Sequence, residues 1–305
     1  MGCCDQRFLR ILIAGWACCP RYMEIRPIQF DEGSLKSYEA LFARCFPPSP
    51  KFGVRALQWL YTENPAGKAV GFDAWEGGTL AAHYVCVPAL INYGNEARRM
   101  LLSLNTATHP DFQGKGLFTK LAQTTYETAA TQGYAAIHGV ANANSTPGFI
   151  RKLGFQLVQP LEARIGVGPL RIDRKILAER TQFQRAWKVD HLQWRCANPV
   201  NAIRARTRRG ISQFFASAKG NLLPAYAQLE DTALAEGAAP QRSASPLRLF
   251  LGLYPEGGCD YRRYVEIPRK LRPSPLNFIF LPLQAHVPPL KAGAACFSFL
   301  DFDAY

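Results

Sequence analysis

The sequence has 305 residues, of which 48% are hydrophobic, and its net charge is +13. This composition excludes an intrinsically disordered chain, and the length allows two domains because single cores stop growing near roughly 250 residues. The nine cysteines include no Cys-x-x-Cys pair, which excludes an ordinary zinc site. We therefore expect a protein of the reducing cytoplasm that binds no metal.

Residues 1–22 differ from the rest of the chain and are predicted to be a disordered or non-native extension. The apolar stretch Phe8–Cys19 is too short to span a bilayer. Pro20 follows it in place of the small-residue cleavage site of a signal peptide. We predict one domain at residues 23–159, beginning with a strand, and a second lobe at residues 160–305.

The first domain is expected to contain a hairpin, a strand and a helix in that order. Residues 71–80 carry a hairpin signal, with Gly77-Gly78 at the turn. Residues 100–108 are predicted to form a strand, because apolar residues precede a turn at His109-Pro110. Leucines and alanines at helical spacing follow over residues 117–129, and Gly133 is expected to end that helix.

The turn between this strand and helix, Gln113-Gly114-Lys115-Gly116, predicts a phosphate site. Glycine lets the backbone approach a ligand closely and adopt positive φ. The free amides of the first helical turn, aided by the helix dipole, would then face an anion. No Gly-Lys-Ser or Gly-Lys-Thr ends a Walker sequence here, so an ATP-binding P-loop is excluded.

The segment after the helix adds a second pattern. Ala135–Ala141 is a short apolar strand that includes His138, a polar turn follows it, and a short helix then ends in Leu153-Gly154-Phe155. Strand, glycine turn, helix, strand, polar turn and short helix together resemble the GNAT superfamily of acyl-CoA-dependent N-acyltransferases. The resemblance is specific over residues 100–158. It implies a mixed α/β sheet with a GNAT-like fold.

The resemblance implies acetyl-CoA or another acyl-CoA as co-substrate. In that superfamily the glycine turn holds the pyrophosphate, and the preceding strand splays from its neighbour to pair with the pantetheine arm. Phe118 places a bulky ring where the family usually has a small residue. The residues implied in acyl-CoA binding are Asn105, Thr106, Ala107, Thr108, Gln113, Gly114, Lys115, Gly116, Leu117, Phe118, Thr119 and Phe149.

The expected chemistry is attack by a neutral amine on the thioester carbonyl, with a backbone N–H holding the oxyanion. The family often has a tyrosine for proton transfer where this chain has Ile150, which cannot transfer a proton. Our candidates for catalysis are His138, Asn142, Asn144 and Ser145, which lie on a strand or just past its end. The alternatives are a core histidine and an ordinary turn or helix cap.

The second lobe contains a repeated phrase. Leu57–Pro65 returns, one residue shorter, as Leu192–Pro199, with a tryptophan and an Asn-Pro in each copy. We therefore predict a degenerate GNAT-like second lobe that shapes the acceptor site, without coenzyme binding because no second Gln-Gly-Lys-Gly occurs. Strands are predicted near residues 211–216, 248–254, 277–283 and 296–302.

The acceptor is expected to be a small-molecule amine, with an amino sugar on a nucleotide carrier as the specific candidate. Residues 164–219 hold 13 basic and 3 acidic residues, a charge that attracts polyanions. The alternatives are a tandem-lobed aminoacyl-tRNA-dependent transferase, a polyanion-binding protein and a catalytically silent acyl-CoA-binding scaffold. No nucleic-acid motif is present, so nucleic acid is not the expected partner, and a homo-oligomer is compatible with the sequence.

Overall fold

The structure is a computed structural model that describes residues 22–208, 210–219, 223–230, 246–272 and 274–302. Apart from Tyr22, the extension predicted at residues 1–22 lies outside the described residues. In the described ranges, no helix has the length and apolar character that a membrane crossing requires.

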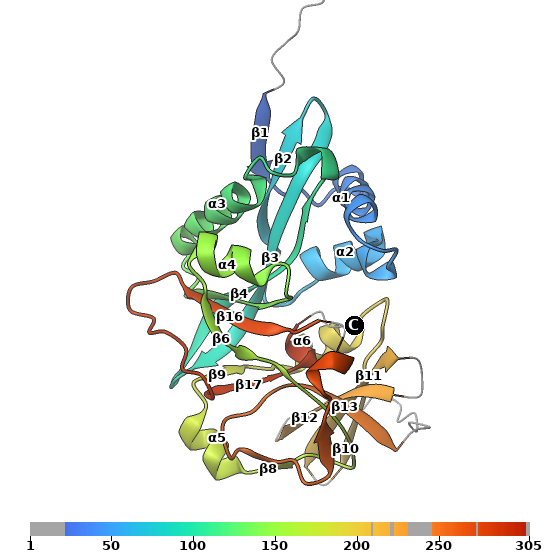
Figure 1. Cartoon of the computed structure of the whole chain (residues 1–305), viewed down its shortest axis with the longest axis vertical. Coiled ribbons are helices and arrows are strands. Elements are labelled where there is room, and N and C mark those ends of the chain that lie inside the picture. The colour runs from blue at the N-terminus through green and yellow to red at the C-terminus, as the bar shows by residue number, and fades with distance from the viewer. Residues whose placement is uncertain (1–21, 209, 220–222, 231–245, 273, 303–305) are drawn as a thin grey trace, which may run out of the picture.

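The N-terminal half combines strands and helices, as Figure 1 shows. Its elements are β1 (Met23–Pro27), α1 (Glu32–Cys45), η1 (Pro50–Phe52), α2 (Val54–Thr62), β2 (Val70–Glu76), β3 (Thr79–Tyr93), β4 (Glu96–Thr108), η2 (Pro110–Phe112), α3 (Leu117–Thr131), β5 (Ala136–Ala141), α4 (Thr146–Leu153) and β6 (Gln156–Pro160).

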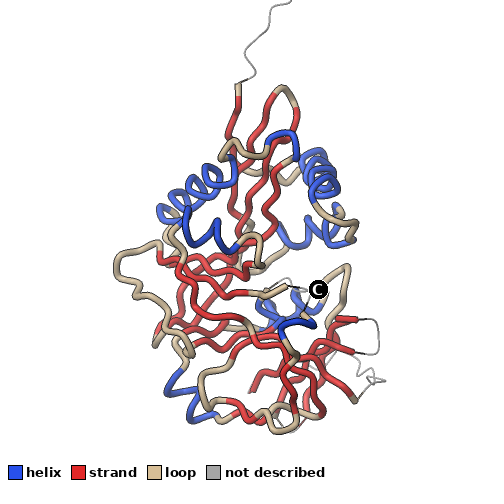
Figure 2. Tube along the Cα trace, in the orientation of Figure 1, coloured by secondary structure: helices blue, strands red, loops and turns tan. Residues whose placement is uncertain are grey.

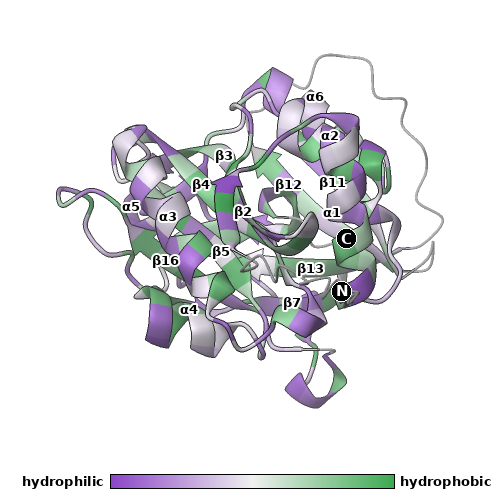
Figure 3. Cartoon of the chain, turned by 90° about the horizontal axis from the view of Figure 1, so that it is seen from above, coloured by the Kyte–Doolittle hydropathy of each residue, from purple (hydrophilic) through white to green (hydrophobic). Residues whose placement is uncertain are grey.

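Strands β1 to β4 are antiparallel neighbours in chain order, and β5 lies parallel to β4. Helices α1 and α2 cover one face of these strands, and α3 and α4 cover the other (Figures 1 and 3). The sheet is therefore buried on both faces, which explains why β3 is buried almost throughout its length.

Local signals explain where the helices begin and end. Asp31 caps α1 by accepting a hydrogen bond from the Ser34 amide at 3.0 Å. Helix α3 buries one face through residues at helical spacing, including Leu121 and Tyr126, and starts directly after Gly116. Gly133 follows α3 with a φ of 79°, as expected for a glycine just beyond a helix.

The C-terminal half consists mostly of strands (Figure 2). Its elements are β7 (Glu162–Val167), β8 (Arg171–Ile172), α5 (Arg174–Arg180), β9 (Phe183–Arg185), α6 (Val189–Cys196), β10 (Arg204–Arg208), β11 (Ile211–Lys219), β12 (Leu223–Glu230), β13 (Leu247–Leu253), β14 (Cys259–Asp260), β15 (Tyr264–Glu266), η3 (Arg269–Leu271), β16 (Asn277–Pro282), β17 (Ala295–Ser298) and η4 (Phe299–Asp301).

The second lobe repeats the pairing order of the first. Strands β10, β11 and β12 are antiparallel, and β13 then lies parallel to β12, as β5 lies parallel to β4. This order confirms the predicted degenerate GNAT-like lobe. Three of its predicted strands are also confirmed, as β11, β13 and β16.

The fourth predicted strand, residues 296–302, is wrong in its second half. Strand β17 ends at Ser298, and the chain turns into η4. The Ser298 side chain accepts a hydrogen bond from the Leu300 amide, and Asp301 accepts one from the Ser298 amide. This capping box closes a turn on residues whose apolar character alone suggested a strand.

The two halves share one sheet of 15 strands. Strand β16 lies between β5 and β6, and β9 pairs with β3. Phe278 and Phe280 on β16 are fully buried. The predicted boundary near residue 160 therefore does not separate two independent sheets. Strands from the second half complete the sheet of the first half.

The two copies of the repeated phrase meet through their tryptophans. The rings of Trp59 and Trp194 stack with centroids 4.8 Å apart. Each indole N–H donates to the other residue's backbone carbonyl, both at 3.2 Å. Such reciprocal contacts indicate a local two-fold relation between α2 and α6, as expected if the lobes are repeats.

Candidate active site

The predicted phosphate turn is an open loop at the start of α3. Gln113, Gly114, Lys115 and Gly116 are all exposed. Gly114 and Gly116 have φ values of 76° and 73°, which only glycine adopts without strain. No atom lies within 4 Å of where a Cβ would stand at either glycine. The loop therefore leaves room for a ligand against its backbone.

The N-terminus of α3 has no side-chain cap, because its cap residue is Gly116. Uncapped amides at a helix start, together with the helix dipole, form a site for an anion. Lys115 adds a cation beside this turn and lies 4.6 Å from the Phe112 ring centroid. Its Nζ is 3.9 Å from a Glu76 carboxylate oxygen, at the limit of an ion pair.

Phe118 does not occupy the loop. Its ring contacts the rings of Phe149 and Tyr84 and packs against the core beneath α4. A Cβ on Gly148 would lie 3.2 Å from Phe118 Cε1, so the glycine makes room for the ring. The bulky residue at this position is thus accommodated toward the interior.

Strands β4 and β5 separate at the centre of the sheet. Their parallel pairing runs from Leu101 opposite Ile137 to Ser103 opposite Gly139 and then ends. Just beyond, the pairing of β4 with β3 shifts by one residue, so that Asn105 and Thr106 form a bulge. Asn105 has a φ of 48°, and no other non-glycine residue of the described ranges has a positive φ.

A cavity of about 740 Å³ opens where the strands separate. Its walls come from the loop after α1, from β4 and β5, from the turn before α4 and from the C-terminal segment. Six residues of the predicted site line it: Asn105, Thr106, Asn142, Asn144, Ser145 and Phe149.

Most of the other residues that line the cavity were not predicted from the sequence. They include Ser49 and Lys51 in the segment between α1 and α2, Ser103 on β4, and Ile279 and Phe302 from the second half. The loop and the C-terminal residues reach the cavity only through tertiary structure. Residues 46–52 are rich in proline and phenylalanine and could have been predicted to form an unusual loop. Nothing in this segment, however, indicates a ligand.

The polar turn between β5 and α4 is held by its own side chains. Asn142 Oδ1 accepts hydrogen bonds from the amides of Asn144 and Ser145, both at 3.0 Å. The turn is therefore an Asx turn that starts α4, and it also lines the cavity. Two residues of the second half brace it, because Ser274 accepts from the Ala143 amide and Asn277 donates to Thr146.

Nine of the twelve residues predicted to bind acyl-CoA do not line the cavity: residues 113–119, which form the glycine turn and the start of α3, and Ala107 and Thr108 on β4. Ala107 is buried and packs on the core beneath α1 and α2. The carbonyl of Thr108 accepts a hydrogen bond from the Cys45 thiol at 3.3 Å. Both residues still pair with β3, so they anchor the end of β4.

His138 lies in the core and does not line the cavity. It is 1% exposed and contacts the rings of Phe183, Phe278 and Phe297. Burial, with a smaller contribution from Arg185, lowers the pKa of His138 to about 3. A neutral imidazole surrounded by aromatic rings fits the core histidine that was the alternative to a catalytic one.

Ile150 also packs against the core. A row of hydroxyl groups from α3 and β3 connects to the cavity through Ser103 on β4. Ser103 lines the cavity, its hydroxyl is 2.7 Å from that of Tyr84, and Tyr84 lies 2.8 Å from the hydroxyl of Tyr126. Burial raises the pKa of both tyrosines, which therefore remain protonated at neutral pH.

The fold is that of known N-acetyltransferases, although at low sequence identity. The structure is similar to that of Eis1 from Mycobacterium abscessus, at 12% identity and a TM-score of 0.54, over 86% of this chain and 74% of that chain. It is similar to a GCN5-related N-acetyltransferase from Kribbella flavida, at 12% identity and a TM-score of 0.56, over 85% and 71% of the two chains. A GCN5-related N-acetyltransferase from Anabaena variabilis gives 11% identity and a TM-score of 0.53, over 86% and 73%.

The sequence identifies the domain more specifically. Residues 24–158 match the family model of the acetyltransferase (GNAT) domain. Residues 24–158 therefore form an acetyltransferase (GNAT) domain, and an acyl-CoA is the co-substrate that this domain implies. No curated protein sequence matches the chain.

Proposed function

We propose that this protein transfers an acetyl or short acyl group from coenzyme A to the primary amine of a small molecule, with an amino sugar on a nucleotide carrier as the acceptor. The observation that supports this proposal most directly is the cavity at the separation of β4 and β5. A bulged strand edge and an open glycine loop flank the same end of β4.

The residues that would hold the acyl-CoA follow from this arrangement. The amides of Gln113–Thr119 would bind the pyrophosphate at the start of α3. The edge of β4 beyond Ser103 has lost its pairing with β5, and its backbone groups would pair with the pantetheine arm. The thioester would then lie against Asn105 and Thr106, which line the cavity.

The reaction needs few participating side chains. The amine nitrogen forms a bond to the thioester carbon, the carbon–sulfur bond breaks, and the proton lost by the amine balances the departing thiolate. A backbone N–H near the β4 bulge would hold the oxyanion. Primary alkyl amines have a pKa of roughly 10, so an acceptor with a lower pKa needs less help from a base.

The cavity favours an acceptor that carries negative charge. Lys51 is the charged side chain among the described lining residues, which include no carboxylate. A cavity without carboxylates neither attracts a polycation nor stabilises the protonated form of the amine. A phosphate-bearing acceptor fits this chemistry better than a polyamine does.

The second half contributes to the acceptor side in this proposal. Ile279 and Phe302 form part of the cavity wall, and Ser274 and Asn277 hold the turn before α4.

The five cysteines of the described ranges are free thiols, which supports the cytoplasm as the compartment.

The basic segment gives less support to a polyanion-binding function. Two of its arginines, Arg185 and Arg195, are buried, at 6% and 5% exposure. Arg164 pairs with Glu162 at 2.7 Å. These three guanidinium groups face the protein interior or a carboxylate, so they contribute little to an exposed basic surface.

The acceptor class can be tested with three amines. Acetyl-CoA is mixed with spermidine, glucosamine or a uridine diphosphate-linked amino sugar, and CoA release is followed with a thiol reagent. We expect the highest kcat/KM for the nucleotide-linked amine. Preference for spermidine would refute the anionic acceptor, and no release with any amine would refute the proposed transferase activity toward small amines.

The acyl-CoA site is tested by Gly116→Leu. Its side chain would enter the space above the loop, and we expect the Kd for acetyl-CoA to rise at least about tenfold, or roughly 1.4 kcal/mol. Isothermal titration calorimetry measures the change. Gly94→Leu is the matched control, because Gly94 also has a positive φ and open space around it but lies in the β3–β4 turn. Equal effects of both variants would contradict the site.

A further inference from the structure

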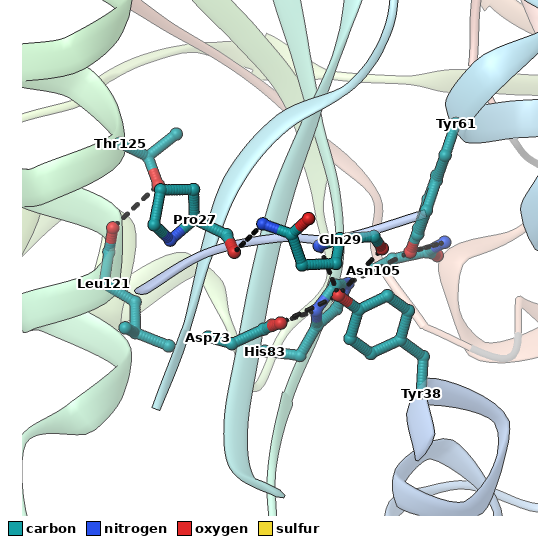
Figure 4. A network of polar contacts seen from close by, with 9 residues as sticks. All are labelled: Pro27, Gln29, Tyr38, Tyr61, Asp73, His83, Asn105, Leu121 and Thr125. Atoms are coloured by element: carbon teal, nitrogen blue, oxygen red, sulfur yellow. Dashed lines mark hydrogen bonds and ion pairs between the residues drawn. The ribbon is translucent and has the colours of Figure 1, made fainter. Parts of the chain in front are cut away.

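A chain of hydrogen-bonded polar side chains runs from Asn105, which lines the cavity, into the core; Figure 4 shows these side chains. Asn105 donates from Nδ2 to the Tyr61 hydroxyl at 3.0 Å, and that hydroxyl lies 3.1 Å from His83 Nε2. His83 Nδ1 is 2.7 Å from Asp73 Oδ1. Tyr38 donates to the other Asp73 oxygen at 2.8 Å.

These five side chains come from five elements, α1, α2, β2, β3 and β4, and four of them are shielded from water. Tyr61, His83 and Tyr38 are fully buried, and Asp73 is 2% exposed. Asn105 is partly exposed, and it is the member of the chain that lines the cavity. Buried polar groups are costly unless each is paired, and this chain pairs them in sequence from Asp73 to the cavity.

The hydrogen-bond directions determine how the Asn105 amide is oriented. The Asp73 carboxylate can only accept, so His83 Nδ1 carries a proton, and in the neutral imidazole this leaves Nε2 to accept the Tyr61 proton. The Tyr61 oxygen then accepts from Asn105 Nδ2. The side-chain oxygen of Asn105 takes no part in this chain and is available to a ligand.

The backbone places Asn105 at the cavity at an energetic cost. A left-handed conformation is unfavourable for a residue other than glycine, by roughly 1 kcal/mol, and asparagine tolerates it better than most. The bulge that requires this conformation lies beside the point where β4 and β5 separate. Strain of this kind is retained where surrounding structure holds a residue for function.

We propose that Asn105 binds the acceptor amine through its side-chain oxygen, and that Tyr61, His83 and Asp73 are positioning residues that hold it. The inference rests on the proposed amine acyltransferase function. A neutral amide oxygen accepts an N–H of the attacking amine and directs the nitrogen lone pair toward the thioester. Unlike a carboxylate, it does not favour the protonated amine, which cannot attack.

Tyr61→Phe and Asn105→Gly test this assignment. Tyr61→Phe removes the hydroxyl that orients the amide, and Asn105→Gly removes the side chain while keeping the positive φ free of strain. With acetyl-CoA and the best acceptor among spermidine, glucosamine and the uridine diphosphate-linked amino sugar, we expect the acceptor KM to rise about five- to tenfold, the usual effect of one lost hydrogen bond. The KM for acetyl-CoA should stay within about twofold.

The control is Tyr38→Phe. It removes a buried hydroxyl from the far end of the same chain, where Tyr38 donates to Asp73, and it leaves the Tyr61–Asn105 contact in place. We expect its acceptor KM to stay within about twofold, with a loss of stability like that of Tyr61→Phe. Asn105→Gln and Asn105→Asp then test whether an amide is required at this position. We expect the acceptor KM to rise more in Asn105→Asp than in Asn105→Gln.

Several outcomes would overturn the inference. An equal acceptor KM in Tyr61→Phe and Tyr38→Phe would make the chain purely structural. A rise in the acetyl-CoA KM alone would assign Asn105 to the pantetheine arm. Wild-type protein that binds acetyl-CoA but acetylates none of the amines would refute the proposed function itself, whereas unaltered variants of an active wild type would refute only the role of Asn105.

Discussion

His138 shows how the surroundings of one residue decide its chemistry. The sequence places it on a strand beside the expected thioester, whereas the structure surrounds it with Phe183, Phe278 and Phe297. Its Nδ1 has no hydrogen-bond partner there. Desolvation disfavours the charged imidazole, so the side chain stays neutral well below neutral pH.

This burial predicts a pH dependence of stability. Because the pKa of His138 is lowered to about 3 in the folded protein, the unfolded chain takes up the proton first as pH falls below the ordinary value. Stability is therefore full above that ordinary value, about 6.5, and falls between it and the folded pKa. Between pH 7.5 and 5, His138 should account for a loss of about 2 kcal/mol. Urea unfolding at both pH values should show this loss in wild type and its absence in His138→Leu.

The same variant tests the catalytic role. We expect acyl transfer by His138→Leu to stay within about threefold of wild type, because His138 does not line the cavity. A larger fall in a protein whose unfolding remains cooperative would restore His138 as a catalytic candidate, since general acid–base groups contribute at least about a hundredfold.

At the scale of elements, α2 and α6 join the two lobes through a pair of matching contacts. Each helix ends in the repeated phrase, and each places a tryptophan on the other. Asn64 and Asn198 both follow these helices, and the side-chain oxygen of each accepts a backbone amide two residues later. The repeated sequence therefore makes the same local structure twice, and the copies bind each other.

A double-mutant cycle should measure this contact. Trp59→Leu and Trp194→Leu each remove the ring stack and the hydrogen bond that the replaced indole donates, whereas the backbone carbonyl that accepts from the other indole remains. Their effects on the free energy of unfolding should therefore overlap through the stack, by about 1 kcal/mol. Urea denaturation of the two single variants and the double variant gives this coupling energy. Trp187, which packs on Arg185, serves as the control partner for Trp59, and Trp187→Leu with Trp59→Leu should be additive. Additivity in both cycles would show that the stack contributes nothing specific.

At the scale of the whole molecule, the second half completes the fold of the GNAT domain. Strand β16 covers the edge of β5 and separates it from β6. Without it, β5 would present unpaired backbone groups, and the core around Phe278 and Phe280 would be open. The catalytic half is therefore not an independent unit, although a family model covers it alone.

A fragment of residues 22–160 should accordingly fail to fold. We expect aggregation or a circular dichroism spectrum without a cooperative thermal transition, because the fragment lacks β16 and the buried β9. Coexpression with residues 161–305 should restore soluble protein that binds acetyl-CoA. A soluble, cooperatively unfolding monomer of the fragment alone would show that β16 is dispensable.

The part of the site that could be predicted depends on local structure. The open glycine turn at Gln113–Gly116 could be predicted because positive φ at glycine and an uncapped helix start are properties of a few consecutive residues. The Asx turn at Asn142 is local in the same way. The strands and helices around them were predicted because apolar periodicity is also read over short windows.

The acceptor side could not be predicted in this way. A hairpin turning at Gly77-Gly78 would place Asp73 opposite Ala82, but a bulge in β3 shifts the register and pairs Asp73 with His83. A shift of one residue turns side chains to the other face, so the sequence alone did not reveal their contact.

By itself, the sequence determined the order of most elements of the first half, the open glycine turn before α3 and the class of fold. The tertiary structure alone decided that β16 enters the first sheet, that Phe302 and Lys51 meet at one cavity, and that Asn105 is held by a buried Asp–His–Tyr chain. The physical reason is that bulges, strand insertion and buried hydrogen bonds depend on pairings between distant segments. Those pairings are favourable only when the whole sheet forms.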